Sequence, residues 1–176
     1  PGAGPLYALV SGYALENGGE VRSWLYCLNA TDFRPAAPPL AVRGAANATR
    51  ALQPLRDGRC WVATRIPGTD FAYATLVRRE ADALEKEAQY ALTGVTHAFS
   101  IAPAPGGTAV AVAVEHRLEL WPDNRRAEIS AVYDAPCALL RWTPEGLFLG
   151  EGNRLHAVHP ETAHPLETIA FQSAWL

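Results

Sequence analysis

Along most of this chain, apolar residues alternate with polar residues at a period of two, which is the pattern of half-buried β-strands. The segment 109–114 is β-branched at every second position, and the alternating segment 117–121 follows after two turn residues. This spacing predicts a β-hairpin. Further strands are expected on either side, at 98–102 and 127–133, which makes four consecutive antiparallel strands.

The C-terminal stretch repeats the same design. Four strands separated by turns are expected there, at 138–142, 147–150, 154–158 and 166–171. Landmark residues recur at nearly constant intervals: Gly107 and Gly146 lie 39 positions apart, and Ile129 and Ile169 lie 40 positions apart. A period of about 40 residues with four strands in each repeat is typical of the blades of a β-propeller.

The first half of the chain follows this period less strictly. Strands are expected at 6–10, 21–28, 40–43, 50–55, 60–64 and 71–77. The first repeat therefore lacks one strand. The segment 78–92 fits either a helix, because its apolar residues recur on one helical face, or a turn followed by a strand at 89–92. We favour the strand because it keeps the repeat in phase.

These elements predict an all-β fold of about four propeller-type blades, each a four-stranded antiparallel sheet, in a single β-propeller-like domain. The approximate blades are 5–45, 46–94, 95–135 and 136–176. Because the first blade lacks a strand and 173–176 would begin another, the two ends can complete one blade and close a small ring. Otherwise the chain is part of a larger ring. The absence of methionine favours a piece of a longer chain, or a half-ring that pairs with another chain.

The composition excludes some classes of function. Apolar residues make up 49% of the chain and charged residues 19%, which excludes an intrinsically disordered protein. The net charge of −3 leaves no basic excess, so we expect neither nucleic acid nor a membrane as a partner. The apolar runs are too short for a transmembrane helix. No targeting segment is recognised, so the compartment, cytoplasmic or secreted, stays unassigned.

Candidate chemistry is sparse. Cys27, Cys60 and Cys137 lie far apart without a CxxC motif, which predicts three small buried apolar side chains. Motifs such as G-x-S-x-G, HExxH and a phosphate-binding loop are absent from the sequence, so we assign no catalytic residue and no cofactor. Four carboxylates are expected in solvated turns with ordinary ionisation: Asp57, Glu115, Asp123 and Glu145.

Three of the five histidines fall within nine residues, at positions 156, 159 and 164. On a strand, His156 and His159 would point to opposite faces, and the turn at Pro160 could return His164 beside one of them. A third ligand is not evident. We therefore interpret these histidines as surface residues of turns and predict no metal site, with His156 and His164 as the residues that a metal would use.

The segment 96–123 resembles a WD40-type blade. His97 lies where that family has its Gly-His pair, the turn at 104–107 looks like the family's Ser-Pro-Asp-Gly turn, and residues 120–121 look like the end of its third strand. The resemblance is best over 96–175. It implies a scaffold that binds other proteins through its rim and faces.

The sequence therefore predicts a non-catalytic interaction or scaffold module. Its partner would be another protein or the remainder of the parent chain, and self-association could complete a ring. Trp and Arg dominate the binding energy of many interfaces. The contact residues that we expect lie at or beside the turns of this fold: Arg141, Trp142, His97 and Arg56. The alternative is a propeller enzyme, a hydrolase or lyase, that acts on a carbohydrate or another small polar substrate near the ring axis.

Overall fold

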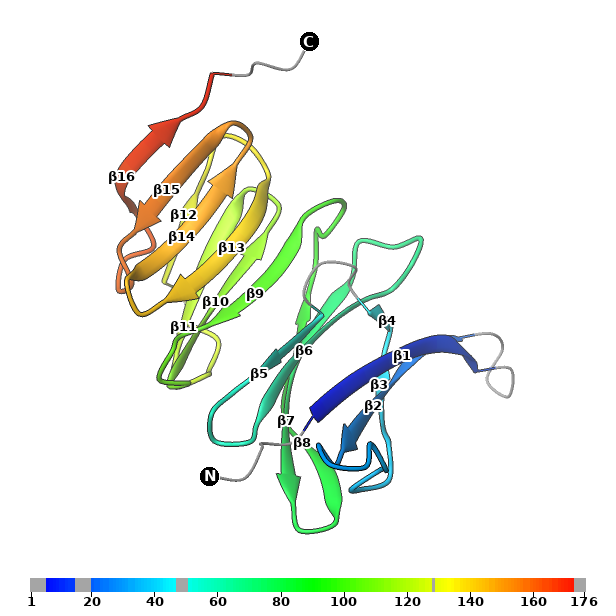
Figure 1. The fold of residues 1–176 in the computed structure, drawn as a ribbon. Helices are drawn as coiled ribbons and strands as arrows, with labels where there is room; N and C mark the ends of the chain where they lie inside the picture. Colours follow the sequence, from blue (N-terminus) through cyan, green and yellow to red (C-terminus); the bar gives the residue numbers. More distant parts are fainter. Residues whose placement is uncertain (1–5, 15–19, 47–50, 128, 173–176) are drawn as a thin grey trace. The chain divides into compact units, whose positions relative to one another are not determined.

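The computed structural model describes residues 6–14, 20–46, 51–127 and 129–172, and this part of the chain is all-β (Figure 1). It contains sixteen strands and no helix, and every strand pairing is antiparallel. The chain divides into two compact units, Pro1–Thr93 and Gly94–Leu176. Each unit contains two sheets in which the strands follow one another in chain order.

The first sheet has three strands, as expected from its sequence: β1 (Leu6–Ala14), β2 (Glu20–Leu28) and β3 (Leu40–Arg43). Along β2, buried residues alternate with half-buried ones. Ser23, Leu25 and Cys27 are the buried residues and share one face. Burial along β2 therefore alternates with the same period of two as the apolar residues in the sequence.

The second sheet has five strands: β4 (Ala45–Ala46), β5 (Leu52–Pro54), β6 (Cys60–Arg65), β7 (Ala72–Glu80) and β8 (Ala83–Leu92). The two short strands β4 and β5 pair with opposite ends of β6, so together they occupy a single strand position. The segment 78–92 forms the end of β7 and all of β8. The helical alternative for this segment is wrong, and the strand is longer than predicted.

The two sheets of this first unit pack on each other through apolar side chains. Leu25 and Val42 of the first sheet share a buried cluster with Val62 and Val77 of the second. Gly44 joins the two sheets with a φ of 87°, and a Cβ atom there would lie 2.8 Å from the carbonyl oxygen of Arg65. Only glycine fits this close approach without a shift of the backbone.

The third and fourth sheets have four strands each, in the order expected. The third contains β9 (Phe99–Pro103), β10 (Ala109–Val114), β11 (Arg117–Pro122) and β12 (Ile129–Val132). The fourth contains β13 (Cys137–Thr143), β14 (Gly146–Glu151), β15 (Arg154–Val158) and β16 (Pro165–Ala170). The hairpin predicted over 109–121 is confirmed, with Val114 opposite Arg117 at its closed end.

The third and fourth sheets also bury apolar faces against each other. Small and branched residues of the third sheet, such as Ala111 and Leu120, lie in one cluster with Leu140, Leu149 and Val158 of the fourth. The Tyr133 hydroxyl, between the two sheets in sequence, donates a hydrogen bond of 2.7 Å to the carbonyl oxygen of Ala163. Each sheet thus supplies one wall of a shared core.

All three cysteines are buried and free, which confirms their prediction as small apolar side chains. Burial raises the pKa of the Cys60 and Cys137 thiols to about 12 in each case. These two thiols are therefore protonated at neutral pH and are poor nucleophiles.

Trp121 is the tryptophan whose removal tests the core directly. Its side chain is fully buried on β11, and its indole N–H donates to Glu119 Oε2 at 2.9 Å. We expect Trp121→Ala to lower the free energy of unfolding by about 3–5 kcal/mol, measured by chemical denaturation. Phe33→Ala, at a side chain that is 67% exposed, is the control and should change it by less than about 0.5 kcal/mol. Equal stability of the two variants would contradict this placement.

Thiol accessibility gives a second test. We expect a disulfide reagent such as DTNB to titrate none of Cys27, Cys60 and Cys137 in the native protein, and all three after denaturation, because burial shields them. The amplitude is read from absorbance of the released thiolate. Rapid native reaction of even one thiol would contradict the buried positions.

Candidate functional site

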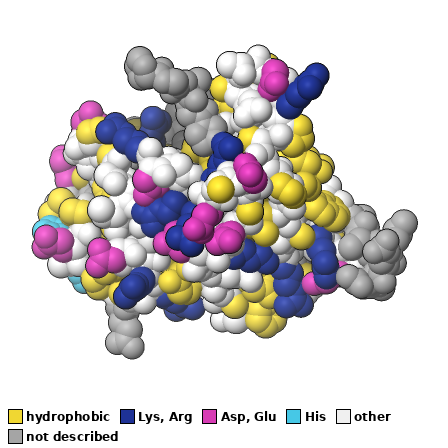
Figure 2. Space-filling view, turned by 90° about the horizontal axis from the view of Figure 1, so that it is seen from below, with side chains coloured by type: hydrophobic (Ala, Val, Ile, Leu, Met, Phe, Trp, Pro, Cys, Tyr) yellow, Lys and Arg dark blue, Asp and Glu magenta, His cyan; other side chains and the backbone are white. Residues whose placement is uncertain are grey.

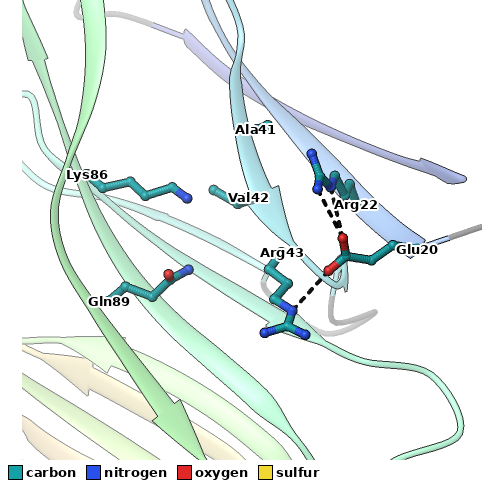
Figure 3. A pocket seen from close by; sticks show the side chains of 7 residues that line it. All are labelled: Glu20, Arg22, Ala41, Val42, Arg43, Lys86 and Gln89. Carbon is teal, nitrogen blue, oxygen red and sulfur yellow. Dashed lines mark hydrogen bonds and ion pairs between the residues drawn. The ribbon is translucent and has the colours of Figure 1, made fainter. Parts of the chain in front are cut away.

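A pocket of about 360 Å³ opens at the edges of the two sheets of the first unit (Figure 3). It is lined by residues of three strands: Glu20 and Arg22 of β2, Ala41, Val42 and Arg43 of β3, and Lys86 and Gln89 of β8. The strands β3 and β8 are edge strands of their sheets. The pocket therefore lies at an outer margin of this unit and not in its apolar core.

Strand geometry places three charged side chains of the first sheet together. Glu20 and Arg22 are two residues apart on β2 and so share a face, and Arg43 lies directly opposite Arg22 in the register. Two cations in this position would repel each other. Glu20 lies between them: its Oε2 is 3.0 Å from Nη2 of Arg22, and its Oε1 is 3.0 Å from Nε of Arg43. Figure 3 shows the two ion pairs meeting at one carboxylate.

Glu20 is held in its ionised form. The hydrogen bond from Arg22 and the charges of Arg22 and Arg43 keep the pKa of Glu20 below its ordinary value. Arg43 is oriented by a further residue, because its Nη1 donates to the Tyr73 hydroxyl at 3.1 Å and its guanidinium carbon lies 5.6 Å from the centre of the Tyr73 ring. This combination fixes the guanidinium by hydrogen bonding and by cation–π contact.

Lys86 supplies the third cation of the pocket and is the only lysine of the chain. Its side chain is exposed and extends, with that of Gln89, from β8 toward β3 (Figure 3). Within the described part of the chain, the Lys86 ammonium makes no ion pair or hydrogen bond. Among the described residues that line the pocket, three cations face one carboxylate, which is a local excess of two positive charges, although the whole chain carries a net charge of −3.

A second cluster of two arginines and one glutamate occurs in the other unit, and it is built differently. Glu119 is 4% exposed and binds Arg117, Arg126 and the indole of Trp121. The hollow beside it measures about 240 Å³. Here a buried carboxylate receives several donors, so the cluster neutralises a buried charge. On the face that Figure 2 shows, cations and carboxylates are interspersed.

The contact residues predicted from the sequence do not line the pocket. His97 and Arg56 are exposed, each in a loop of a different unit. Arg141 and Trp142 are neighbours on β13 but point to opposite faces, because Trp142 packs on the buried cluster of the third and fourth sheets while Arg141 is exposed. Their role in binding stays a prediction. Sequence reasoning missed the pocket, although the Glu-x-Arg pattern of β2 was a local signal for it.

The interpretation of His156 as a surface residue is wrong. The alternation along β15 turns this side chain inward, where it is 4% exposed. Its Nε2 lies 2.7 Å from Glu151 Oε2 and its Nδ1 lies 2.8 Å from Thr168 Oγ1. Thr168, and not His164, is the residue opposite His156 on β16, and His164 is exposed in the preceding turn. Among the described residues, no three His, Cys, Asp or Glu side chains are grouped as metal ligands.

The expectation of an ordinary, solvated Glu115 is also wrong. Its Oε1 accepts hydrogen bonds from three successive backbone N–H groups, those of Thr96, His97 and Ala98, at 2.5, 2.5 and 3.0 Å. Burial alone would raise the pKa of Glu115, but these hydrogen bonds together outweigh it and hold the pKa below its ordinary value. Glu115 thereby ties the β10–β11 turn to the loop that precedes β9.

Comparisons with known proteins identify a fold and no family. No family model and no curated protein matches the sequence. The chain is similar to a solved structure of Hsv2 from Kluyveromyces lactis, described as having a complete loop 6CD, with a TM-score of 0.53 and 9% sequence identity. The match covers 90% of this chain and 49% of the Hsv2 chain, so this chain spans about half of that length. At this identity the likeness concerns the fold alone.

The described residues include no helix that is both long and apolar enough to span a membrane.

Glu115 makes a pH-dependent contribution to stability that can be measured. Because its pKa is lowered in the folded state, its stabilisation is complete above the ordinary value of 4.5 and is lost as the pH falls through the lower folded pKa. We expect Glu115→Gln to lower the free energy of unfolding at pH 7 by about 1–2 kcal/mol and to flatten the loss of stability below pH 4.5. Denaturation at pH 3 to 7 provides the measurement, and Glu161→Gln, in an exposed turn, is the control. An unchanged pH profile in Glu115→Gln would contradict the assignment.

Proposed function

We propose that this chain is a non-catalytic binding module, built from propeller-type blades, that takes an acidic segment of a protein partner into the pocket between β3 and β8. The observation that carries the proposal is the local excess of two positive charges in a pocket where Lys86 has no partner among the described residues. A partner carboxylate would supply the missing counter-charge.

The propeller arrangement is supported by three features. All four sheets are antiparallel meanders with strands in chain order, and within each unit neighbouring sheets pack face to face. In the second unit, the first strands of the two sheets, β9 and β13, lie next to each other. This is how the inner strands of adjacent blades meet around a propeller axis. The likeness to Hsv2 extends over most of the chain.

The chemistry of the pocket suits carboxylates on a flexible segment. Arg43 is held in place by Glu20 and Tyr73, so less conformational entropy is lost when it binds. Lys86 is a mobile point charge that can adjust to the ligand. The two bordering strands are sheet edges, whose outward backbone groups can pair with an extended peptide. Together these features favour a short acidic peptide.

Three surface carboxyl groups have a lowered pKa, which suits a role as ion-pair and hydrogen-bond acceptors. Hydrogen bonds hold the pKa of Glu20, Asp57 and Glu145 below its ordinary value in each case, the main donors being Arg22, Arg59 and Thr143 respectively. A general acid at neutral pH needs a raised pKa. These groups instead act as permanent hydrogen-bond acceptors.

The pocket is tested with a fluorescein-labelled hexaglutamate peptide and fluorescence anisotropy. We expect Lys86→Glu to weaken binding about five- to thirtyfold, because reversing one charge at contact distance costs about 1–2 kcal/mol near a protein surface. Arg34→Glu is the matched control, since it reverses one exposed charge in the same unit away from the pocket. Equal weakening in both variants would mean that the peptide responds only to net charge, which contradicts a specific pocket.

The single lysine allows the same contact to be located chemically. Acetylation by an N-hydroxysuccinimide ester can modify one side-chain amine in this chain, that of Lys86. Bound hexaglutamate should slow this reaction, as followed by mass spectrometry of the peptide that contains Lys86. A rate independent of the probe at saturating concentration would place the probe elsewhere.

A further inference from the structure

The fourth sheet presents an apolar face on the side opposite its core. Leu139 and Ile169 are 45% and 51% exposed there. Phe148, Leu155 and Ala157 lie with Ile169 and the carboxylate residue Glu167 around one hollow of about 80 Å³, so their side chains share this face. Alternation along the strands explains the pattern, because the intervening residues of β14 and β15 point into the core shared with the third sheet.

This face is equivalent in register to a face that is buried in the third sheet. The hairpins close on the pairs Val114–Arg117 and Glu151–Arg154, and counting from these pairs aligns the two sheets. Two rows of side chains on the third sheet lie on the face that packs on the fourth sheet. The first row is Ala102, Ala111, Leu120 and Ile129, and the second row is Ser100, Ala113, Leu118 and Ala131. The equivalent residues of the fourth sheet form its exposed face. The first row there is Arg141, Phe148, Ala157 and Glu167, and the second row is Leu139, Gly150, Leu155 and Ile169. In the third sheet, this face packs on the next sheet along the chain. The fourth sheet has the same face, but there it is exposed.

The first sheet presents the complementary kind of face. One face of the first sheet packs on the second sheet, which follows it in the chain. Its other face therefore corresponds to the face by which the fourth sheet packs on the sheet before it. This second face carries Leu6 and Val10, which are 40% and 53% exposed, and the half-buried Trp24 and Tyr26. The Trp24 ring lies against Gly12, where a Cβ atom would be 3.4 Å from it. The other end of this face carries the charged residues Glu20, Arg22 and Arg43, so its apolar part is the end formed by Leu6, Val10, Trp24 and Tyr26.

We propose that two copies of this chain associate head to tail, with the exposed face of the fourth sheet of each copy packed on the exposed face of the first sheet of the other. Each contact repeats the sheet-to-sheet packing already present inside each unit. A head-to-tail contact that closes after two copies covers both faces and stops further growth. Two copies also supply about the length of the Hsv2 chain, of which this chain covers 49%.

The mass in solution tests the proposal. At about 100 µM, light scattering after size exclusion should give twice the 19.0 kDa of one chain. Ile169→Asp, on β16, and Val10→Asp, on β1, should each weaken the dimer at least tenfold, because each places a charge in both contacts. Val132→Asp is the matched control, since Val132 is 79% exposed and lies on the other face of the third sheet. Circular dichroism melts confirm that the variants are folded.

Mixing the two interface variants distinguishes head-to-tail pairing from other occupants. A heterodimer of Ile169→Asp with Val10→Asp has one intact contact, so the mixture should form more dimer than either variant alone. A wild-type monomer, which would mean that the two faces meet within one chain, overturns the proposal. So does a fully dimeric Val10→Asp variant, which would mean that two fourth sheets pair with each other. An open polymer would contradict closure after two copies.

Discussion

Sheet-to-sheet burial is the constraint on which this structure depends. A single sheet would leave its apolar face in water, which is unfavourable. In each unit, two sheets exclude water from a common core: Leu25 and Val62 share one buried cluster, and Leu120 and Leu149 share the other. The hydrophobic gain of this burial offsets the conformational entropy of ordering many short strands. Turns contribute little to that burial, so their residues can take other roles.

Carboxylates accept hydrogen bonds at the hairpin ends of the sheets, outside the apolar cores. Glu115 gathers three backbone N–H groups of one loop, and Glu151 accepts from the backbone N–H of Ala135 while its other oxygen meets His156. Both lie at the corresponding hairpin end of their sheets. Buried or half-buried N–H groups need acceptors, and a carboxylate at the hairpin provides them without extending the sheet. The same structural solution thus recurs in successive sheets with different local partners.

The pocket of the first unit follows from the same architecture. The edge strands β3 and β8 bury apolar side chains such as Val42 and Leu84 on one face and carry charged residues at the exposed margin. Register sets Arg22 opposite Arg43, and Glu20 relieves their repulsion while leaving a net positive charge. In the second unit, Glu119 is buried and accepts from both neighbouring arginines. The difference between a structural cluster and a candidate binding site is therefore the burial of one carboxylate and the presence of one additional cation.

The sequence by itself determined most of the strands, the hairpin over 109–121 and the burial of the cysteines, because alternation and turn residues act over a few neighbouring positions. It left 78–92 open between a helix and a short strand, and the structure has a long β-hairpin there. It also showed that the first sheet would have one strand fewer. The tertiary structure alone decided which polar groups meet. Glu20 and Arg43 are 23 positions apart, and Glu115 lies 17 to 19 positions from the N–H groups that it binds. Such contacts depend on how one strand or sheet lies against another, which no local pattern encodes. Alternation along β15 likewise leaves open which of its two faces is buried, and packing against the third sheet decides that His156 lies on the buried one.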